Sequence, residues 1–535
     1  MNCDPTNSLE RQVAELFVVR TSGYLNDQQR RYPQWELSNA EIRSLLERGV
    51  GGVILLGGSS VELQQRTQQL QNWSDQQLLF CADVEEGVGQ RFEGASWLVP
   101  PLALGRLYQK RSQEALELAE RYGRCTADQA RRCGLNWVLG PVCDVNNNPA
   151  NPVINVRAWG EDPATVGALA AAFQRGLSCG GVLGCAKHFP GHGDTASDSH
   201  LDLPLLPHDR DRLNQIELPP FREVIAAGVD SVMTAHLLLP QLDPDRPATL
   251  SSAVLSDLLR KELGFDGLVV TDALVMEAIT ARHGAAEAAV LAFEAGADLI
   301  LMPADADAAI RGLCRAIAQG RIPMHRLQTA LLLRREALAR LDAHASHQAK
   351  PLPTRAERKL EQELVAASLE LLPAHGIPNS PGINLIRVDG IWPCAALSGA
   401  APALRSPESR GYRPVVVHSQ GVSPWQDDPD APLALDRLGD GPVLLQLFLR
   451  GNPFRGHRDR QEPWRAVVQQ LQNNDRLIGL IVYGSPYLWD ELRDVLEPSI
   501  AAAYSPGQMP EAQKQVLTAL LRDSSTIQRP SDFTD

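Results

Sequence analysis

Short apolar runs alternate with helical patterns through the first two thirds of the chain. Eight such runs are Leu16–Arg20, Gly52–Leu56, Leu78–Asp83, Leu135–Val142, Val182–His188, Ser231–His236, Leu268–Asp272 and Asp298–Met302. Between them lie stretches with helical periodicity, among them Asn39–Glu47, Gln113–Cys133, Ala164–Ser178, Pro219–Ala227, Ser256–Leu263 and Ala285–Ala295. Nearly continuous apolar strands separated by helices are typical of a parallel sheet covered on both faces. Eight strand–helix units therefore predict an α/β fold of the (β/α)8 TIM-barrel type.

A second α/β pattern follows. A helical segment at Ala309–Leu341 ends the first region, and the polar residues 343–355 with their two prolines predict a linker. A short helix is expected at Ala356–Leu372. The later strand candidates are Ile383–Val388, Pro414–His418, Val443–Phe448, Leu477–Tyr483 and a last one near Ser499–Tyr504. We therefore predict a barrel over residues 1–345, a linker and connecting helix over 346–375, and a smaller doubly wound α/β sandwich domain over 376–535.

Composition and charge exclude several classes of protein. The formal net charge of −13 argues against nucleic acid as a partner and weakly against an anionic membrane surface. No apolar run reaches the roughly 18 residues that span a bilayer, and the first residues show no secretory pattern. The nine cysteines have irregular spacing without a CxxC pair, as expected for reduced thiols. These features predict a cytoplasmic enzyme or binding protein of ordinary globular composition.

Titratable residues stand at the ends of several predicted strands. Asp83 ends the third run, Lys187 and His188 the fifth, His236 the sixth and Asp272 the seventh. In a (β/α)8 barrel the chemistry lies at the carboxyl ends of the strands. Polar residues also end many strands that carry no function, so this pattern alone leaves both interpretations open.

The segment of residues 187–204, KHFPGHGDTASDSHLDLP, is dense in groups useful for catalysis. Asp198 and His200 are two residues apart and fit a carboxylate–imidazole pair that moves a proton. The glycines Gly191 and Gly193 suit a mobile loop. A zinc site is a second interpretation, disfavoured by the lysine beside His188 and the missing HExxH, and a plain surface loop is a third. The metal ligands would come from His188, His192, Asp194, Asp198 and His200.

Asp272 ends the apolar run within GFDGLVVTDALVMEAI. A carboxylate held at the top of a barrel strand is suited to act as a nucleophile. It would equally serve as the N-cap of a helix over Ala273–Thr280. The residues alone do not decide between these roles.

Together these motifs resemble a known family. KHFPGHG…DSH…LP and GFDGLVVTDAL resemble glycoside hydrolase family three, and within it the β-N-acetylglucosaminidase (NagZ-like) branch. The segments Leu135–Val145 and Arg157–Pro163 are similar to further family motifs. The resemblance covers essentially the whole barrel region. The second domain resembles only loosely the α/β sandwich that follows the barrel in many members.

The resemblance implies a retaining exo-glycosidase that releases terminal β-linked N-acetylglucosamine (GlcNAc). The implied substrate is a cell-wall muropeptide in cytoplasmic peptidoglycan recycling, and no metal or organic cofactor is implied. Asp272 would be the nucleophile that forms a covalent glycosyl-enzyme, and His200, held by Asp198, would be the acid/base. The sugar-binding residues implied by the same motifs are Asp83, Arg91, Arg157, Lys187 and His188.

One residue departs from the family pattern, and several alternative interpretations stay open. Glu86 stands where the family segment after Asp83 usually has a glycine, which puts Arg91 and the outer sugar site in question. Asp83 and Arg157 are alternatively a structural ion pair in the barrel mouth. The rival activities are a β-glucosidase-type exo-glycosidase of the same family and a β-N-acetylglucosaminide phosphorylase. A sugar-binding or structural protein that has lost activity is the rival from another class.

Overall fold

The computed structural model divides the chain into two compact units, Met1–Leu360 and Glu361–Asp535. It describes residues 5–195, 203–280, 282–342, 352–372, 376–377, 381–418, 434–450 and 463–521. Each unit has its own sheet and its own buried core. The predicted linker over 343–355 lies mostly outside the described residues.

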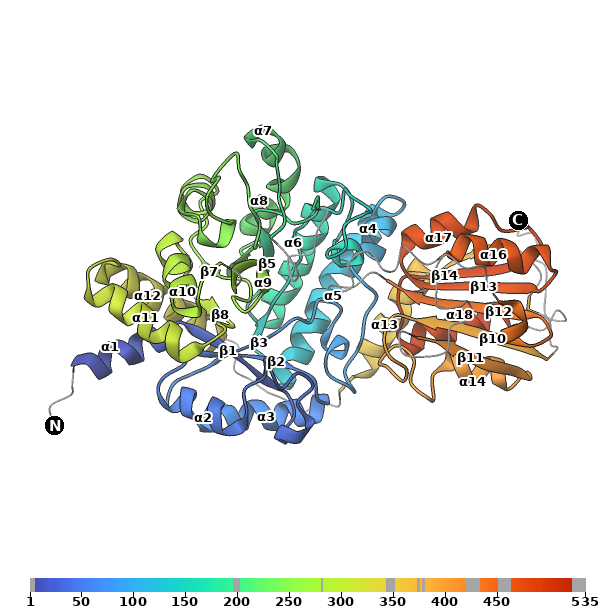
Figure 1. Cartoon of the computed structure of the whole chain (residues 1–535), viewed down its shortest axis with the longest axis horizontal. Helices are drawn as coiled ribbons and strands as arrows, with labels where there is room; N and C mark the ends of the chain where they lie inside the picture. The colour runs from blue at the N-terminus through green and yellow to red at the C-terminus, as the bar shows by residue number, and fades with distance from the viewer. Residues whose placement is uncertain are drawn as a thin grey trace, which may run out of the picture. The chain divides into compact units, whose positions relative to one another are not determined.

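The first unit contains eight parallel strands that close into a barrel (Figure 1). Their bounds are β1 Phe17–Ser22, β2 Gly52–Leu56, β3 Leu79–Ala82, β4 Trp137–Val138, β5 Cys185–Phe189, β6 Ser231–Thr234, β7 Leu268–Val270 and β8 Ile300–Leu301. Continuous pairing runs β4-β3-β2-β1-β8 and β5-β6-β7. Single bridges from Trp137 to Leu183 and from Val270 to Leu299 join the two sheets. The predicted (β/α)8 barrel is confirmed.

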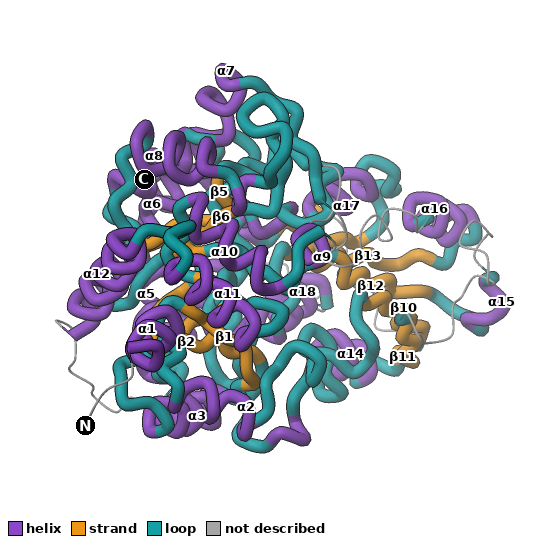
Figure 2. Tube along the Cα trace, turned by 60° about the vertical axis from the view of Figure 1, so that its left-hand side comes forward, coloured by secondary structure: helices purple, strands orange, loops and turns teal. Residues whose placement is uncertain are grey.

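Helices follow the strands and cover the barrel, and Figure 2 shows β1, β2, β5 and β6 among them. The main ones are α2 Asn39–Glu47, α3 Ser60–Asn72, α5 Ser112–Arg132, α6 Pro163–Gly180, α8 Pro219–Ala226, α10 Ala285–Ala295, α11 Ala306–Ala318 and α12 Met324–Asp342. The shorter ones are α1 Pro5–Ala14, α4 Leu102–Tyr108, α7 Arg210–Arg212 and α9 Glu277–Thr280. Local sequence sets their starts: Ser38 and Glu41 form a capping box at α2, and Asp162 with Pro163 begins α6.

Two predicted helices differ from the structure in the first unit. The segment Ala309–Leu341 is not one helix but α11 and α12. The break falls where Gly320 adopts a left-handed φ of +75° and Pro323 precedes α12. The helix predicted at Ser256–Leu263 is a π-helix over Ala253–Glu262, placed between β6 and β7 as expected.

The second unit is a six-stranded sheet in the order β11-β10-β12-β13-β14-β9. The strands are β9 Glu370–Leu372, β10 Gly382–Val388, β11 Tyr412–Val417, β12 Val443–Leu449, β13 Leu477–Gly484 and β14 Ala501–Ser505. The helices are α13 Arg355–Ser368, which begins before Glu361, and α14 Pro402–Glu408, α15 Leu435–Leu438, α16 Trp464–Asn473, α17 Pro486–Arg493 and α18 Pro510–Leu520. Two apolar clusters pack on the two faces, with Leu445 in one and Leu444 in the other. The predicted doubly wound sandwich is confirmed.

The prediction of a helix through Leu372 is wrong at its end. α13 ends at Ser368, and β9 pairs antiparallel with β14 and forms the edge of the sheet. The Glu370 carboxylate also accepts a hydrogen bond from the Trp489 indole at 3.0 Å. Pairing with an open sheet edge therefore overrides the local helical pattern. Within the described residues, helix length and apolar character nowhere reach what a membrane crossing requires.

Candidate active site

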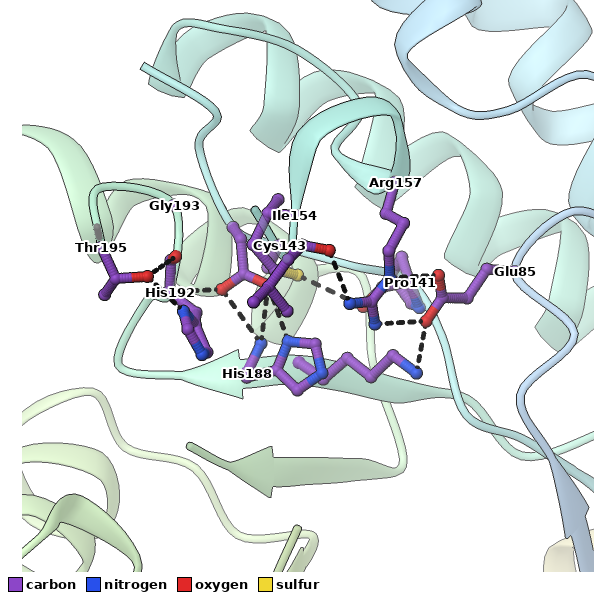
Figure 3. Close-up of polar contacts among 12 residues, drawn as sticks. Glu85, Pro141, Cys143, Ile154, Arg157, His188, His192, Gly193 and Thr195 are labelled. Carbon is purple, nitrogen blue, oxygen red and sulfur yellow. Dashed lines mark hydrogen bonds and ion pairs between the residues drawn. The ribbon is translucent and has the colours of Figure 1, made fainter. Parts of the chain in front are cut away.

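A buried lysine in β5 contacts two carboxylates from the segment that follows β3. One of these carboxylates, Glu85, also faces Arg157 (Figure 3). Lys187 Nζ lies 2.7 Å from Asp83 Oδ1 and 2.6 Å from Glu85 Oε1. The lysine side chain is only 1% exposed. Burial opposes its charge, but Asp83 and Glu85 together raise the pKa of Lys187 above its ordinary value. The lysine is therefore a fixed cation inside the barrel mouth.

Glu85 connects this lysine to Arg157 on the β4–α6 segment. Arg157 donates from Nε and Nη2 to the two carboxylate oxygens of Glu85, each at 2.9 Å, and from Nη1 to the Val153 carbonyl at 3.1 Å. Burial opposes ionisation of Glu85, yet Arg157 and Lys187 hold its pKa well below the usual range. The carboxylate partner of Arg157 is thus Glu85, and the suggested direct pair of Asp83 with Arg157 is wrong.

Asp83 is the member of this group that solvent reaches most easily. Its side chain is 39% exposed, while that of Glu85 is 6% exposed. Arg91 donates from Nε to the Asp83 backbone carbonyl at 3.0 Å, so it reaches this residue through the main chain. Burial would raise the pKa of the Asp83 carboxyl, but the charge of Lys187 lowers it below its ordinary value. An ionised carboxylate that is partly exposed and firmly held can accept hydrogen bonds from a ligand's hydroxyls.

Glu86, the departure from the family segment, turns away into the protein. Its side chain is buried, and Oε2 accepts a hydrogen bond from the Trp97 indole at 2.8 Å. Gly87 next to it adopts a φ of +78°. The turn thus keeps a left-handed glycine, and Arg91 still reaches Asp83, so the substitution does not separate these two residues.

A second buried cluster orders the segment after β5. Asp144, which follows β4 and is fully buried, lies 2.7 Å by Oδ2 from His188 Nδ1. The same carboxylate accepts the backbone N–H groups of His188 and His192. Burial opposes the charge, but the pKa of Asp144 is lowered by His188 and by these hydrogen bonds. Asp144 therefore fixes both the orientation of His188 and the turn that leads to His192.

The glycines after β5 serve close packing. A Cβ atom on Gly193 would lie 1.7 Å from the Val145 carbonyl oxygen, and one on Gly191 would lie 2.9 Å from Glu217. Asn151 donates to the carbonyls of His192 and Gly193, at 2.8 and 2.9 Å. In residues 191–195 the backbone is packed and hydrogen bonded, so the two glycines allow close approach there, and the mobility of the loop stays a prediction.

Asp272 follows β7 by two residues. Its Oδ1 accepts the backbone N–H of Ala273 at 2.7 Å, and its own N–H donates to Thr234 Oγ1 at 3.4 Å. The helix expected over Ala273–Thr280 begins only at Glu277. The N-cap interpretation of Asp272 is therefore wrong. His236 supports the same turn, since its ring nitrogens lie 3.0 Å from the Ala273 carbonyl oxygen and 2.8 Å from Thr249 Oγ1.

Asp198 and His200 lie outside the described residues, 203 being the next one described after 195. The two ends of this segment are joined by His208, whose Nε2 is 2.9 Å from Asp194 Oδ2. Arg212 also contacts Asp194, at 3.2 Å. Among the described residues, His, Cys, Asp and Glu side chains form no group of three or more that would hold a metal ion.

Sequence reasoning missed two residues of the site. It assigned no role to Glu85 or Asp144, although both stand in segments that carry the family motifs. Each is a carboxylate two residues after an apolar run that predicts a barrel strand, Leu78–Asp83 or Leu135–Val142, which was the available signal. The partners of Glu85 and Asp144, by contrast, come from distant parts of the chain, so residue spacing could not predict these contacts.

A cluster of fixed charges at the strand ends is typical of the active face of a barrel enzyme. The chain belongs to glycosyl hydrolase family 3: the model of its N terminal domain matches residues 8–333, and that of the bacterial C-terminal domain matches residues 378–522.

Named relatives agree with this family. The chain is 37% identical over 287 residues to beta-hexosaminidase A of Pseudoalteromonas piscicida, in a match covering 49% of this chain and 47% of that protein. It is 38% identical over 271 residues to a beta-hexosaminidase of Stenotrophomonas maltophilia strain K279a, covering 50% and 80%. The chain thus spans about half the length of the first relative. The structure of a β-N-acetylglucosaminidase from Paenibacillus sp. str. FPU-7 superposes with a TM-score of 0.77 at 29% identity, covering 96% of each chain.

Proposed function

We propose that this family 3 glycoside hydrolase is a retaining exo-β-N-acetylglucosaminidase. The observation that carries the proposal is the buried Lys187 with Asp83 and Glu85, at the strand ends of the barrel that also bears Asp272. Relatives named beta-hexosaminidase and β-N-acetylglucosaminidase support GlcNAc as the sugar. The proposed activity is hydrolysis of terminal β-linked GlcNAc.

Asp272 is the proposed nucleophile. It attacks the anomeric carbon and forms a glycosyl ester, while a proton passes to the leaving oxygen. The hydrogen bond from the Ala273 N–H fixes one oxygen of the attacking carboxylate. Water then cleaves the ester and restores the β configuration.

His200, held by Asp198, is the proposed acid/base. An imidazole with an ordinary pKa of about 6.5 is half protonated near neutral pH, so it can donate a proton in the first step and accept one in the second. Unlike a carboxylate, it adds no second negative charge beside Asp272 during hydrolysis of the ester.

The sugar is held by Asp83, Arg91, Arg157, Lys187 and His188 in this proposal. Lys187 is buried, and Asp83 is its more exposed partner, so they offer a donor and an acceptor to neighbouring hydroxyls. His188 Nδ1 is hydrogen bonded to Asp144, so its Nε2 is the atom proposed to contact the sugar. Each nitrogen of the Arg157 guanidinium donates a hydrogen bond to Glu85 or Val153, so its main contribution is to hold Glu85 in place.

The natural substrate proposed is a muropeptide with GlcNAc β-1,4-linked to an anhydro-muramic unit, cleaved in the cytoplasm during peptidoglycan recycling. The catalytic barrel is assigned to residues 1–345, the linker and connecting helix to 346–375, and the sandwich domain to 376–535. The reaction needs neither metal nor organic cofactor, and no nucleic acid or membrane partner is proposed.

A substrate panel tests the proposal. Nitrophenyl β-GlcNAc and nitrophenyl β-glucoside are compared, each with and without inorganic phosphate. We expect the first substrate to be preferred by at least a hundredfold in kcat/KM, with free GlcNAc as product in both buffers. Preference for the glucoside would favour a β-glucosidase-type enzyme, and release of GlcNAc 1-phosphate would favour a phosphorylase. Turnover of neither substrate would contradict the proposed activity.

A further inference from the structure

A cavity of about 640 Å³ lies between the β1–α2 and β8–α11 segments of the first unit. Its lining includes Arg20 from β1, Trp35 and Glu36 from the β1–α2 segment, Val275 after β7 and Met302 after β8. This volume is within the range of small-molecule sites, about 300–1,000 Å³. The residues assigned above to catalysis or sugar binding are not among those lining it.

Arg20 is a cation in the wall of this cavity whose hydrogen-bonding capacity is unused. Its side chain is 14% exposed and makes no hydrogen bond within the described structure. Its contacts are a 3.6 Å ion pair with the fully buried Glu36 and positions 5.4 and 5.9 Å from the ring centroids of Tyr32 and Trp35. Its Nε is buried without a hydrogen-bond partner, and leaving a buried N–H donor unpaired is costly. The arrangement therefore favours a bound group rich in oxygen acceptors.

An exposed aromatic face accompanies this cation. Trp35 is 38% exposed, and its ring stacks on Tyr32 with centroids 6.0 Å apart. The segment is held to β1, since Leu37 donates to the Arg20 carbonyl at 3.0 Å and Thr21 Oγ1 donates to the Leu37 carbonyl at 2.8 Å. A fixed indole face beside a hydrogen-bond donor suits a pyranose ring, which has an apolar face and polar edges.

The acidic side chains around the cavity have partners of their own. Glu41 is bonded to Ser38 in the capping box of α2, and Asp305 caps α11. Asp307 pairs with Arg48. Arg20 is thus the cation in the lining that can donate hydrogen bonds to a ligand.

The position of the cavity gives the ligand a role, on the basis of the proposed function. The sugar-binding residues follow β3, β4 and β5, and Asp272 follows β7. The cavity lies at β8 and β1, so β6 and β7 stand between the cavity and β5 on one side of the ring of strands. A substrate that places its terminal sugar on β3–β5 and its anomeric carbon at Asp272 directs its leaving group toward β8 and β1.

We propose that this cavity is the subsite for the sugar ring of the leaving group. The ring stacks on Trp35, and its oxygen atoms accept hydrogen bonds from Arg20. The subsite distinguishes oligosaccharide substrates, which reach it, from GlcNAc glycosides with a small aglycone, which do not.

Trp35→Ala tests this assignment with two substrates of similar intrinsic reactivity. GlcNAc-β-1,4-GlcNAc reaches the cavity, and methyl β-N-acetylglucosaminide does not. We expect kcat/KM to fall about tenfold for the disaccharide, mainly through KM, and less than twofold for the methyl glycoside; stacking of about 1–1.5 kcal/mol gives this factor. Trp35→Phe keeps an aromatic face and should recover most of the loss.

Two further variants complete the test. Arg20→Lys keeps the charge beside Glu36 but lacks the planar fork, and it should also raise KM for the disaccharide alone. Trp73→Ala is the matched control, because Trp73 follows α3 just before β3, at the opposite end of the strands, and should change neither substrate. Equal losses on both substrates in Trp35→Ala, or no loss on either, would overturn the subsite. Failure of the unaltered enzyme on both substrates would instead contradict the proposed activity.

Discussion

Lys187 Nζ lies 2.6 Å from Glu85 Oε1, and neither side chain is more than 6% exposed. Removing two charges from water costs several kcal/mol per ion, and such a pair persists only where further partners complete it. Asp83 forms a second ion pair with Lys187, and Arg157 forms a second ion pair with Glu85. The four side chains therefore form one network around the buried Lys187–Glu85 pair, and loss of any member leaves another charge without compensation.

Glu85→Gln should destabilise the barrel strongly. The variant leaves Lys187 and Arg157 with one buried counter-charge fewer, and breaking a buried pair of this kind costs about 3–5 kcal/mol. Urea denaturation at pH 7 measures the change. The matched variant Glu287→Gln removes an exposed partner of Arg321, where less than about 1 kcal/mol is expected. Similar losses in the two variants would contradict the network.

Stability should fall on mild acidification because of His192. Burial lowers the pKa of this residue to about 4 against the opposing charge of Asp144, while the unfolded chain has a pKa near 6.5. The unfolded state therefore binds the proton first, and stability present above pH 6.5 is lost as the pH falls toward 4. Between pH 7.5 and 5 the contribution is about 2 kcal/mol.

Comparison with His192→Gln isolates this contribution, because glutamine does not titrate. The variant should show a shallower decline of the unfolding free energy between pH 7.5 and 5. Parallel declines in the two proteins would show that His192 does not carry the effect.

Asp144→Asn should impair turnover through His188. The carboxylate holds His188 Nδ1 at 2.7 Å, and a charge-assisted hydrogen bond of this kind contributes about 1.5–3 kcal/mol. We expect kcat/KM for nitrophenyl β-GlcNAc to fall roughly 10- to 100-fold. Asp162→Asn, at the N-cap of α6, is the control, since asparagine caps helices equally well. Unchanged kinetics in a folded Asp144→Asn enzyme would remove His188 from the sugar site.

His200→Ala should separate the two chemical steps. An aryl glycoside with a good leaving group needs little acid assistance, so the first step remains fast, whereas hydrolysis of the ester loses its base. Stopped-flow measurement should show a burst of phenol followed by slow turnover, and azide should restore the rate. A variant that loses the burst and is not rescued by azide would argue for a different acid/base.

The sequence predicts the larger architecture well because periodicity reports burial directly. The strands Gly52–Leu56 and Leu477–Gly484 stand almost where the apolar runs place them. Errors fall where nonlocal or backbone factors decide. β9 forms because an edge strand is open to pairing, and the long terminal helix divides at a glycine with positive φ.

The candidate site was predictable in its residue types and not in its connections. Asp83, Arg157 and Lys187 were all named, yet the carboxylate that joins the last two is Glu85, which is adjacent to neither in sequence. Likewise the partner of His188 is 44 residues away. Pairings of this kind depend on the closure of the barrel, which strand spacing does not encode.

The central claim is that Asp272 forms a covalent bond with N-acetylglucosamine, and trapping that species tests it most directly. The enzyme is incubated with a slow 5-fluoro analogue of a β-N-acetylglucosaminide that bears a good leaving group, and its peptides are mapped by mass spectrometry. The account predicts one added fluorinated sugar on the peptide that contains Asp272, and none in Asp272→Ala. A sugar attached to another residue would contradict it.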